Sequence, residues 1–293
     1  MWNELIDQET GAYIANKAPA LFGVLPLYGV LIFIGFGLSC GYAYIGWNNK
    51  KYRNWDFIFC VSFTSIFALY GAKLWYLIFD PINAFSGVND VLDVIILFCI
   101  PAFGRSIIGT VIFVPIGIWI WQKYWGPDNN TLEIFDVLLP SILIGQAIGR
   151  WGNFVNHQVY GDIVDPDKLN WLPIWLKNNM FIIDDSGAEW RNPLFLYESF
   201  ADLGSLLIII LIFKTNNYWK RGTMGFSYIF LYGIVRSSTE LLRDSQFQMS
   251  WGANWNIHIP TSFITALILV FVSFFFIIYL QWGDKIKKFI KFI

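Results

Sequence analysis

The residues best suited to chemistry are cations that lie inside apolar stretches. Residues 149–161 read GRWGNFVNHQVYG, which places Arg150 at the end of a long apolar run. Because a guanidinium does not give up its proton in practice, one placed in or beside hydrocarbon must meet an anion or several acceptors. Lys73, Arg105 and Arg236 also interrupt apolar segments. The pattern predicts an anion-binding site at membrane depth.

The composition predicts an all-α integral membrane protein. Hydrophobic residues make up 56% of the 293 residues and charged residues 14%, with a mean hydropathy of +0.51. Soluble domains carry about 25% charged residues. A net charge of −1 without a basic tract gives no indication of nucleic-acid binding. Cys40, Cys60 and Cys99 lack metal-ligand spacing and are predicted to be buried, inert thiols.

The apolar stretches predict about seven transmembrane helices, since a spanning helix needs about 20 residues. The fourth is short, which suits a helix buried among the others, and the short stretch 91–101 is expected to lie along the membrane interface. The seven predicted spans are 21–46, 57–79, 103–122, 135–150, 193–214, 222–242 and 260–282.

Three parts of the chain follow from these spans. Residues 1–150 hold four spans, 151–192 form a small extracytoplasmic cap with little regular structure, and 193–293 hold three spans. The sequence contains no evident internal repeat, which argues against an inverted-repeat transporter.

The orientation follows from the loop cations, because cytoplasmic loops carry the excess of Lys and Arg. The predicted topology places the N-terminus outside and the C-terminus in the cytoplasm of a multi-pass cell-membrane protein. The side with five cations holds Lys17, Lys168, Lys177, Arg191 and Arg243, and the side with eleven holds Lys50, Lys51, Arg53, Lys123, Lys214, Lys220, Arg221, Lys285, Lys287, Lys288 and Lys291.

The four intramembrane cations converge on the outer leaflet in this topology. Arg150 ends the fourth span, Arg236 lies in the outer half of the sixth, and Lys73 and Arg105 lie near the outer ends of the second and third. Arginine supplies forked donors that match phosphate oxygens. The anion expected at this depth is a phospholipid head group.

Helical spacing adds neutral and acidic groups to this site. Gln146, Arg150 and Asn153 share one helix face if that helix continues far enough. A second face, in the sixth span, carries Tyr232, Arg236, Glu240 and Arg243. Further candidates are Tyr28 in the first span and, just after Pro193, Tyr197 and Glu198.

Structural roles compete with each of these assignments. Glu240 can neutralise Arg236 or Arg243, Lys73 can extend to the surface, and Arg105 can stabilise a helix start. For Arg150 and Arg236 the acids on their own helix faces are too few to satisfy them. His157 and His258 are read as outer-side surface residues.

The block at 149–161 resembles the signature G-R-x-G-N-F-x-N-x-E-x-x-G of bacterial prolipoprotein diacylglyceryl transferases. The resemblance covers most of the chain. Further matching blocks, in the family's order, are LYGVLIFIGF at 27–36, GAKLWYLIF at 71–79, DVLLPSILIGQAIGR at 136–150, NPLFLYE at 192–198 and YGIVRSSTELLR at 232–243.

The resemblance implies transfer of the diacylglyceryl group of phosphatidylglycerol to the thiol of a prolipoprotein's lipobox cysteine. A thioether forms and glycerol phosphate leaves, without a cofactor. The implied catalytic residues are Arg150 and Arg236. The implied substrate-binding positions are Tyr28, Asn153, Asn156, Gly161, Tyr232 and Glu240, with Gln158 at the position of the signature acid. The candidates from the residue pattern itself are Lys73, Arg105, Gln146, Tyr197, Glu198 and Arg243.

Three positions depart from the family pattern. The signature glutamate is Gln158, a histidine in an I-H-G-G-L-I-G-like segment is Gly104, and the histidine before proline in H-P-x-x-L-Y-E is Asn192. Thiol activation can then come from the cationic field around Arg105 and Arg150, or from His157. The alternatives to an active enzyme are a diverged, non-catalytic lipoprotein- or lipid-binding paralogue and an anionic-lipid transporter.

Overall fold

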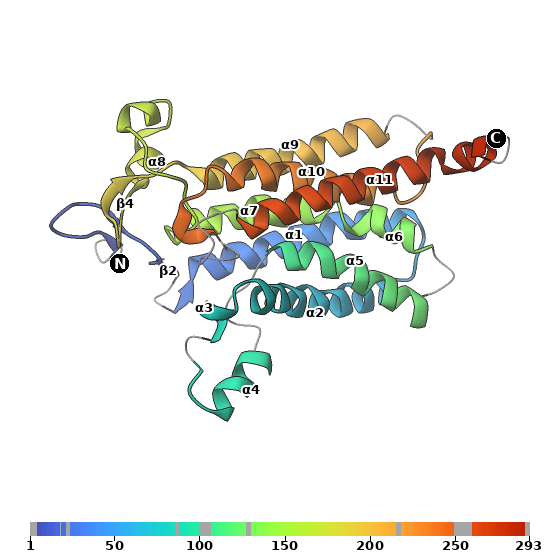
Figure 1. Ribbon diagram of the computed structural model, residues 1–293, viewed down its shortest axis with the longest axis horizontal. Coiled ribbons are helices and arrows are strands. Elements are labelled where there is room, and N and C mark those ends of the chain that lie inside the picture. The colour runs from blue at the N-terminus through green and yellow to red at the C-terminus, as the bar shows by residue number, and fades with distance from the viewer. Residues whose placement is uncertain are drawn as a thin grey trace. The chain divides into compact units, whose positions relative to one another are not determined.

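The computed structural model describes residues 5–17, 19–21, 24–85, 88–99, 107–126, 130–214, 218–248 and 260–290, which are mainly helical (Figure 1). The long helices are α1 (Leu27–Asn49), α2 (Asn54–Phe79), α5 (Ile107–Tyr124), α9 (Leu194–Lys214), α10 (Thr223–Glu240) and α11 (Thr261–Ile290). The shorter ones are α3 (Pro81–Phe85), α4 (Val91–Cys99), α6 (Thr131–Leu138), α7 (Ile142–Val155), α8 (Ile174–Asn178) and the 3-10 helices η2 (Pro166–Leu169) and η3 (Ser245–Phe247).

Six segments within the described part of the chain are long and apolar enough to cross a membrane, which confirms the predicted class. They are Leu27–Asn49, Asn54–Phe79, Ile107–Tyr124, Thr131–Val155, Leu194–Phe213 and Thr261–Gly283. The fourth is longer than predicted, since it begins at Thr131 and continues to Val155 as α6 and α7, interrupted around Pro140.

The sixth predicted span, 222–242, forms α10 but is not among these six segments. Its last turns carry Arg236, Ser237 and Glu240, which lower its hydropathy. All three side chains are buried. A helix with such a polar end requires protein groups around it, because lipid offers no hydrogen-bond partners.

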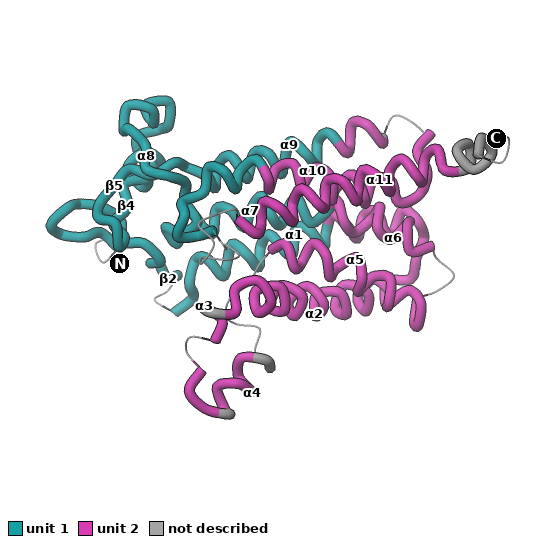
Figure 2. Tube along the Cα trace, in the orientation of Figure 1, with its two compact units in different colours: residues 1–41, 141–208, 238–248 teal, residues 42–140, 209–237, 249–293 magenta. Residues whose placement is uncertain are grey.

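The chain divides into two compact units (Figure 2). The first comprises residues 1–41, 141–208 and 238–248, and the second comprises 42–140, 209–237 and 249–293. Helices α1, α9 and α10 each pass from one unit into the other.

The cap segment 151–192, in the first unit, has more regular structure than the sequence indicated. Besides η2 and α8 it contains a hairpin of β4 (Phe181–Asp184) and β5 (Gly187–Trp190). Strand β1 (Tyr13–Ile14) pairs parallel to β4, which gives the sheet order β1-β4-β5, while β2 (Ala20–Leu21) and β3 (Leu25–Pro26) form a separate antiparallel pair. The cap core consists of Tyr160, Leu169, Leu172, Leu176, Met180, Ile182, Phe195 and Leu196.

A buried arginine forms ion pairs that join the β4–β5 hairpin to the segment after α10. Arg191 is 1% exposed, and its Nη2 and Nη1 lie 2.5 Å from Asp184 Oδ2 and from Asp244 Oδ2. Its guanidinium also lies 5.1 Å from the centre of the Tyr160 ring, and the Tyr160 hydroxyl donates to Asp184 at 2.6 Å. The buried Arg191 cation therefore has two charged partners, both in the first unit.

Acid is expected to weaken the ion pair between Arg191 and Asp184. Burial by itself would raise the pKa of Asp184, but hydrogen bonds from Ser186 and Tyr160 outweigh it and lower the pKa to about 2. A carboxyl with a lowered pKa contributes stability above its ordinary value near 4, and this is lost as the pH falls towards 2. We expect amide-exchange protection of 181–191 to decline over that interval. Asp184→Asn should remove most of this decline; an unchanged pH profile in the variant would contradict the assignment.

In the second unit, small residues let α2 and α5 approach closely. A Cβ on Gly109 would collide with the backbone oxygen of Gly71, and one on Gly71 would collide with Phe113. Close backbone approach at small residues is a common basis of helix association in membranes.

The same unit brings two cation-rich loops to one carboxylate. Glu133 Oε1 lies 3.6 Å from Lys50 Nζ and 2.9 Å from Arg221 Nε, and Glu133 Oε2 accepts a 2.6 Å hydrogen bond from Tyr52. The loops after α1 and before α10 therefore meet at Glu133.

Candidate functional site

Helix α7 carries the predicted Gly-Arg block and packs one face against α1. On that face Gly145 approaches Gly35 and Ser39, and Gly152 approaches the Tyr28 ring, where a Cβ on Gly152 would lie 3.1 Å from Tyr28 Cδ2. This contact fixes α7 against the start of α1. Tyr28, a predicted substrate-binding residue, thereby lies beside the signature.

The polar face of α7 begins one residue after each of these glycines. Gln146, Arg150 and Asn153 follow Gly145, Gly149 and Gly152, about 100° further round the helix. Because α7 continues to Val155, the three side chains share a face as predicted. Because the glycine face packs against α1, the polar face points about 100° away from that contact.

Glu198 joins two buried arginines into one network. Arg150 is 4% exposed, and its Nη1 lies 2.9 Å from Glu198 Oε2. Arg243 Nη2 lies 2.9 Å from Glu198 Oε1, which also accepts a 3.2 Å hydrogen bond from Thr239. Glu198 itself is fully buried. The predicted candidates Arg150, Glu198 and Arg243 are therefore in contact.

Two further acids belong to this network. Glu240 Oε2 lies 3.3 Å from Arg243 Nε, so neutralising Arg243 is one role that Glu240 performs. Asp202 Oδ2 lies 3.9 Å from Arg150 Nε, and Asp202 is 1% exposed. The expectation that Arg150 has too few acids considered its own helix only, whereas α9 supplies two.

Sequence reasoning missed Asp202, Ser199 and Trp151. Asp202 follows Glu198 by one helical turn, and that spacing within an apolar span is the signal that could have found it. Trp151 Nε1 donates to Ser199 Oγ at 3.2 Å, and Ser199 Oγ donates to the Ala147 oxygen at 3.0 Å. These bonds hold α9 against α7, which keeps Glu198 and Asp202 at Arg150.

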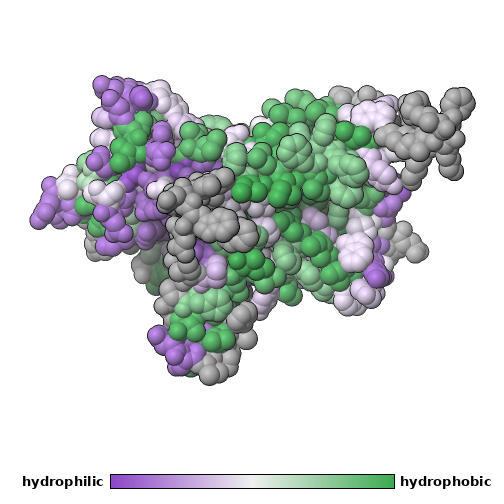
Figure 3. Space-filling view, in the orientation of Figure 1, coloured by the Kyte–Doolittle hydropathy of each residue, from purple (hydrophilic) through white to green (hydrophobic). Residues whose placement is uncertain are grey.

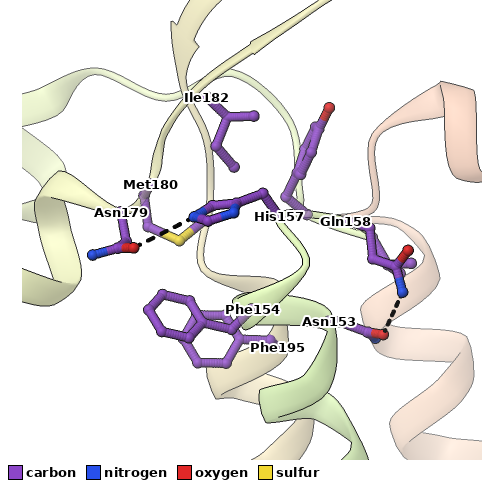
Figure 4. Close-up of a pocket in the computed structure, with 10 residues that line it drawn as sticks. Asn153, Phe154, His157, Gln158, Asn179, Met180, Ile182 and Phe195 are labelled. Carbon is purple, nitrogen blue, oxygen red and sulfur yellow. Dashed lines mark hydrogen bonds between the residues drawn. The ribbon is translucent and has the colours of Figure 1, made fainter. Parts of the chain in front are cut away.

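The amides of the signature are joined by the residue that departs from the family pattern. Gln158 Oε1 accepts from Asn156 Nδ2 at 2.6 Å. Gln158 Nε2 donates to Asn153 Oδ1 at 3.3 Å (Figure 4). An uncharged amide can donate and accept at once, so Gln158 connects two predicted substrate-binding residues.

Restoring the family's acid should therefore change little. In Gln158→Glu the carboxylate still accepts from Asn156, and rotating the Asn153 amide allows a second bond, so we expect the activity that the resemblance implies to stay within roughly threefold of the parent. Gln158→Leu removes both bonds and leaves two part-buried amides, so we expect this activity to fall by about 10- to 100-fold. Initial rates of the two variants test both expectations. Equal activity of the leucine variant would show that the amide pair is dispensable.

Gly161 is the point where three segments meet. Its N–H donates to the Asn192 oxygen at 3.0 Å, and it forms an antiparallel bridge with Arg243. A Cβ on Gly161 would lie 2.6 Å from the Leu242 oxygen and 2.7 Å from Asn192 Cβ. The glycine of the signature thus permits close backbone contact between the loop after α7, the start of α9 and the end of α10.

Gly161→Ala is expected to disturb this junction. The added methyl cannot fit without backbone movement, which costs about 1–3 kcal/mol and shifts Arg243 relative to Glu198. We expect a lower thermal unfolding midpoint and an activity loss of at least about tenfold. Gly204→Ala is the matched control, since a Cβ there meets nothing within 4 Å. Equal behaviour of the two variants would refute the junction role.

His157 is buried, contrary to its reading as a surface residue. It is 3% exposed, and its ring stacks on Tyr13 with centroids 4.6 Å apart. Burial lowers its pKa. It points towards Asn179 and Met180 in a pocket with room for about one water molecule, whereas Gln158 points towards Asn153 (Figure 4). This orientation gives no support to His157 as the thiol's base.

The remaining candidates are described one by one or lie outside the described residues. Tyr197, in the first turn of α9, stacks on Trp171. Tyr232 and Arg236 lie on α10 in the second unit and are 1% and 9% exposed. Lys73, on α2 in the second unit, is 2% exposed, so its alternative of extending to the surface is wrong. Arg105, Gly104 and His258 lie outside the described residues.

The fold and this cluster define a class: a multi-span α-helical membrane protein with a cluster of buried, ion-paired arginines. Comparison with models of known families identifies the family of this chain. The model of the prolipoprotein diacylglyceryl transferase family matches residues 20–279, and the chain belongs to that family.

Curated relatives agree with this assignment. A phosphatidylglycerol–prolipoprotein diacylglyceryl transferase of Mycoplasmopsis pulmonis is 35% identical over 243 residues, covering 79% of this chain and 73% of the relative. Proteins of the same name from Clostridium kluyveri and Clostridium botulinum are 31% identical over 263 residues (88% and 93%) and 32% identical over 252 residues (85% and 90%).

Proposed function

We propose that this protein transfers the diacylglyceryl group of phosphatidylglycerol to the cysteine thiol of prolipoproteins. Family membership and the names of its relatives support this activity. One observation links this activity to a particular residue: Arg150, the signature arginine, is buried and ion-paired with Glu198 and Asp202 of α9.

The reaction is a displacement at carbon. The sulfur attacks the glycerol carbon that bears the phosphate ester, a C–S bond forms, the C–O bond breaks, and glycerol phosphate leaves with the electron pair. The thiol proton must be lost beforehand, because the thiolate is the nucleophile. The enzyme therefore needs to stabilise charge that develops on the departing phosphate.

Arg150 and Arg236 are the groups we assign to that phosphate. Fixed cations in a low-dielectric site act strongly on charge that develops in a transition state. Glu198 fixes the Arg150 guanidinium through Nη1, which carries two of its five N–H donors. Within the first unit the cluster sets two guanidiniums against three carboxylates, so its net charge is not positive. Its members are Arg150, Arg243, Glu198, Asp202 and Glu240. A further cation, for which we propose Arg236 one turn before Glu240, is needed to attract an anion.

The neutral groups around Arg150 are assigned to the lipid and peptide. Asn153, Asn156 and Gln158 form one connected set of amides, which suits hydroxyl and carbonyl groups rather than charges. We also retain Tyr28, Gln146, Tyr197 and Tyr232 as substrate-binding positions, with Lys73 and Arg105 as additional cations for the site. The peptide that carries the cysteine is the lipobox segment of the precursor.

The membrane is the bacterial plasma membrane in this proposal, with the N-terminus outside and the C-terminus in the cytoplasm. The shared contact of Lys50 and Arg221 with Glu133 supports placing their loops on one side. In intact cells a membrane-impermeant thiol reagent should modify a cysteine placed at Asp185 and spare one placed at Lys51. The reverse pattern would contradict the orientation.

The decisive assay uses purified protein, phosphatidylglycerol vesicles and a peptide with a lipobox cysteine. A mass gain of one diacylglyceryl unit on that cysteine, with release of glycerol phosphate, is the expected result. The same peptide with serine in place of cysteine should gain nothing. An intact protein that binds the peptide without modifying it would favour the non-catalytic paralogue.

A further inference from the structure

The cap carries three large apolar side chains that face outward. Trp171, Ile174 and Trp175 are 58%, 78% and 58% exposed, and together they are called the α8 patch here. Leu172 and Leu176, which alternate with them, belong to the cap core and are 5% and 4% exposed. The buried leucines fix the segment, so the α8 patch cannot turn inward without taking the cap core apart.

The α8 patch continues an apolar face of a membrane-spanning helix. The Trp171 ring stacks on Tyr197 with centroids 6.4 Å apart and planes at 16°. Tyr197 begins a face of α9 on which Phe200, Leu203 and Leu207 are 65%, 45% and 55% exposed. Their spacing of three or four residues places them along one side of the helix. Because α9 is apolar enough to span a membrane, this side faces lipid, and Trp171 lies at its end.

The chemistry of the α8 patch fits the boundary between lipid and water. Tryptophan concentrates at membrane interfaces, where its ring meets both the head groups and the upper acyl chains. Polar side chains border the patch: Lys177 Nζ donates to Asn170 Oδ1 at 2.6 Å and lies 5.4 Å from the Trp190 ring. Figure 3 shows apolar surface over the α8 part of the cap, with hydrophilic residues around it.

We propose that the α8 patch inserts into the bilayer interface at the N-terminal end of α9 and seats the cap on the membrane. The occupant is lipid rather than a second protein chain, because the patch is continuous with the lipid-facing side of α9. Seating the cap in this way holds the loop after α7, which carries the signature amides, at the depth of the head groups.

Photolabelling of the full chain tests this without relying on transfer activity. The protein is placed in phosphatidylcholine vesicles that contain a trace of phosphatidylcholine with a diazirine close to the glycerol. Peptide mapping should find adducts in 168–177 and in the exposed face of α9, and few in the hairpin turn at Asp185. Labelling of that turn as heavy as that of 171–175, or no adducts in 171–175 beside a labelled α9, would overturn the proposal.

Two variants sharpen the test. Ile174→Ser combined with Trp175→Ser should lower cap labelling at least fivefold while α9 stays labelled, which also shows that the helices remain inserted. Lys168→Ser combined with Asn178→Ser changes exposed polar residues of the same segment and should leave labelling unchanged. Equal cap labelling of both variants would overturn the proposal. An unlabelled α9 would overturn it too, since the lipid-facing side is its premise.

Discussion

Replacing Arg150 by alanine is expected to lower kcat/KM for diacylglyceryl transfer by roughly 10³-fold or more. Removing a single preorganised donor from a charge-stabilising site typically costs 10²–10³, and this change removes a full charge as well. It also leaves Glu198 and Asp202 with less positive charge nearby in a buried site. Initial rates of thioether formation on a lipobox peptide, measured across phosphatidylglycerol concentrations, give the loss.

Arg150→Lys is the control that separates charge from geometry. Lysine keeps the positive charge but lacks the forked donors, so we expect a rate between those of the parent and the alanine variant. Binding of phosphatidylglycerol without turnover should weaken in the same order. Transfer at the parental rate in Arg150→Ala would remove the arginine from the catalytic assignment while leaving the family assignment untouched.

Replacing Glu198 by alanine is expected to cost both stability and activity. The change takes away the carboxylate that contacts Arg150 and Arg243 at 2.9 Å each. Breaking a buried ion pair by deleting one partner typically destabilises by about 3–5 kcal/mol, because the remaining charge loses its counter-charge. We expect a markedly lower thermal unfolding midpoint in detergent, and activity lost because Arg150 is no longer held in position.

Glu198→Gln provides the matched comparison. The amide keeps the shape and one acceptor for Thr239, Arg150 or Arg243, so its effect should be smaller than that of alanine. Combining Glu198→Ala with Arg243→Ala should lower the unfolding midpoint by less than the two single changes added together, since both remove the same ion pair. A double variant that loses as much as both single variants added together would show that the two residues act independently.

The structure describes two of the three residues that depart from the family pattern. Gln158 has a definite position, since its amide joins Asn153 and Asn156. Asn192 lies at the junction beside Gly161, where its backbone oxygen accepts the glycine's N–H. Neither departure disturbs the contacts of Arg150. This supports an active enzyme, with thiol activation by the cationic field as the explanation we retain, over the paralogue or transporter alternatives.

Most of the helical framework could be predicted from the sequence. Apolar runs of about 20 residues permit few other structures in lipid, where backbone groups must be satisfied within the segment. The one span whose hydropathy fell short, α10, is the one that carries Arg236 and Glu240. The hairpin of the cap escaped prediction because its strands are four residues each and draw their register from β1, far away in the chain.

The sequence by itself determined the membrane class, the Gly-Arg block and the shared faces of α7, because these depend on local composition and on the helical repeat. The tertiary structure alone decided which charges meet. Ser199 and Trp151 hold α9 to α7 where Glu198 and Asp202 reach Arg150. Gly161 lets three backbones approach near Arg243, which reaches Glu198. Ion pairing between distant segments depends on packing at a few ångströms, and helical periodicity carries no information about the partner helix.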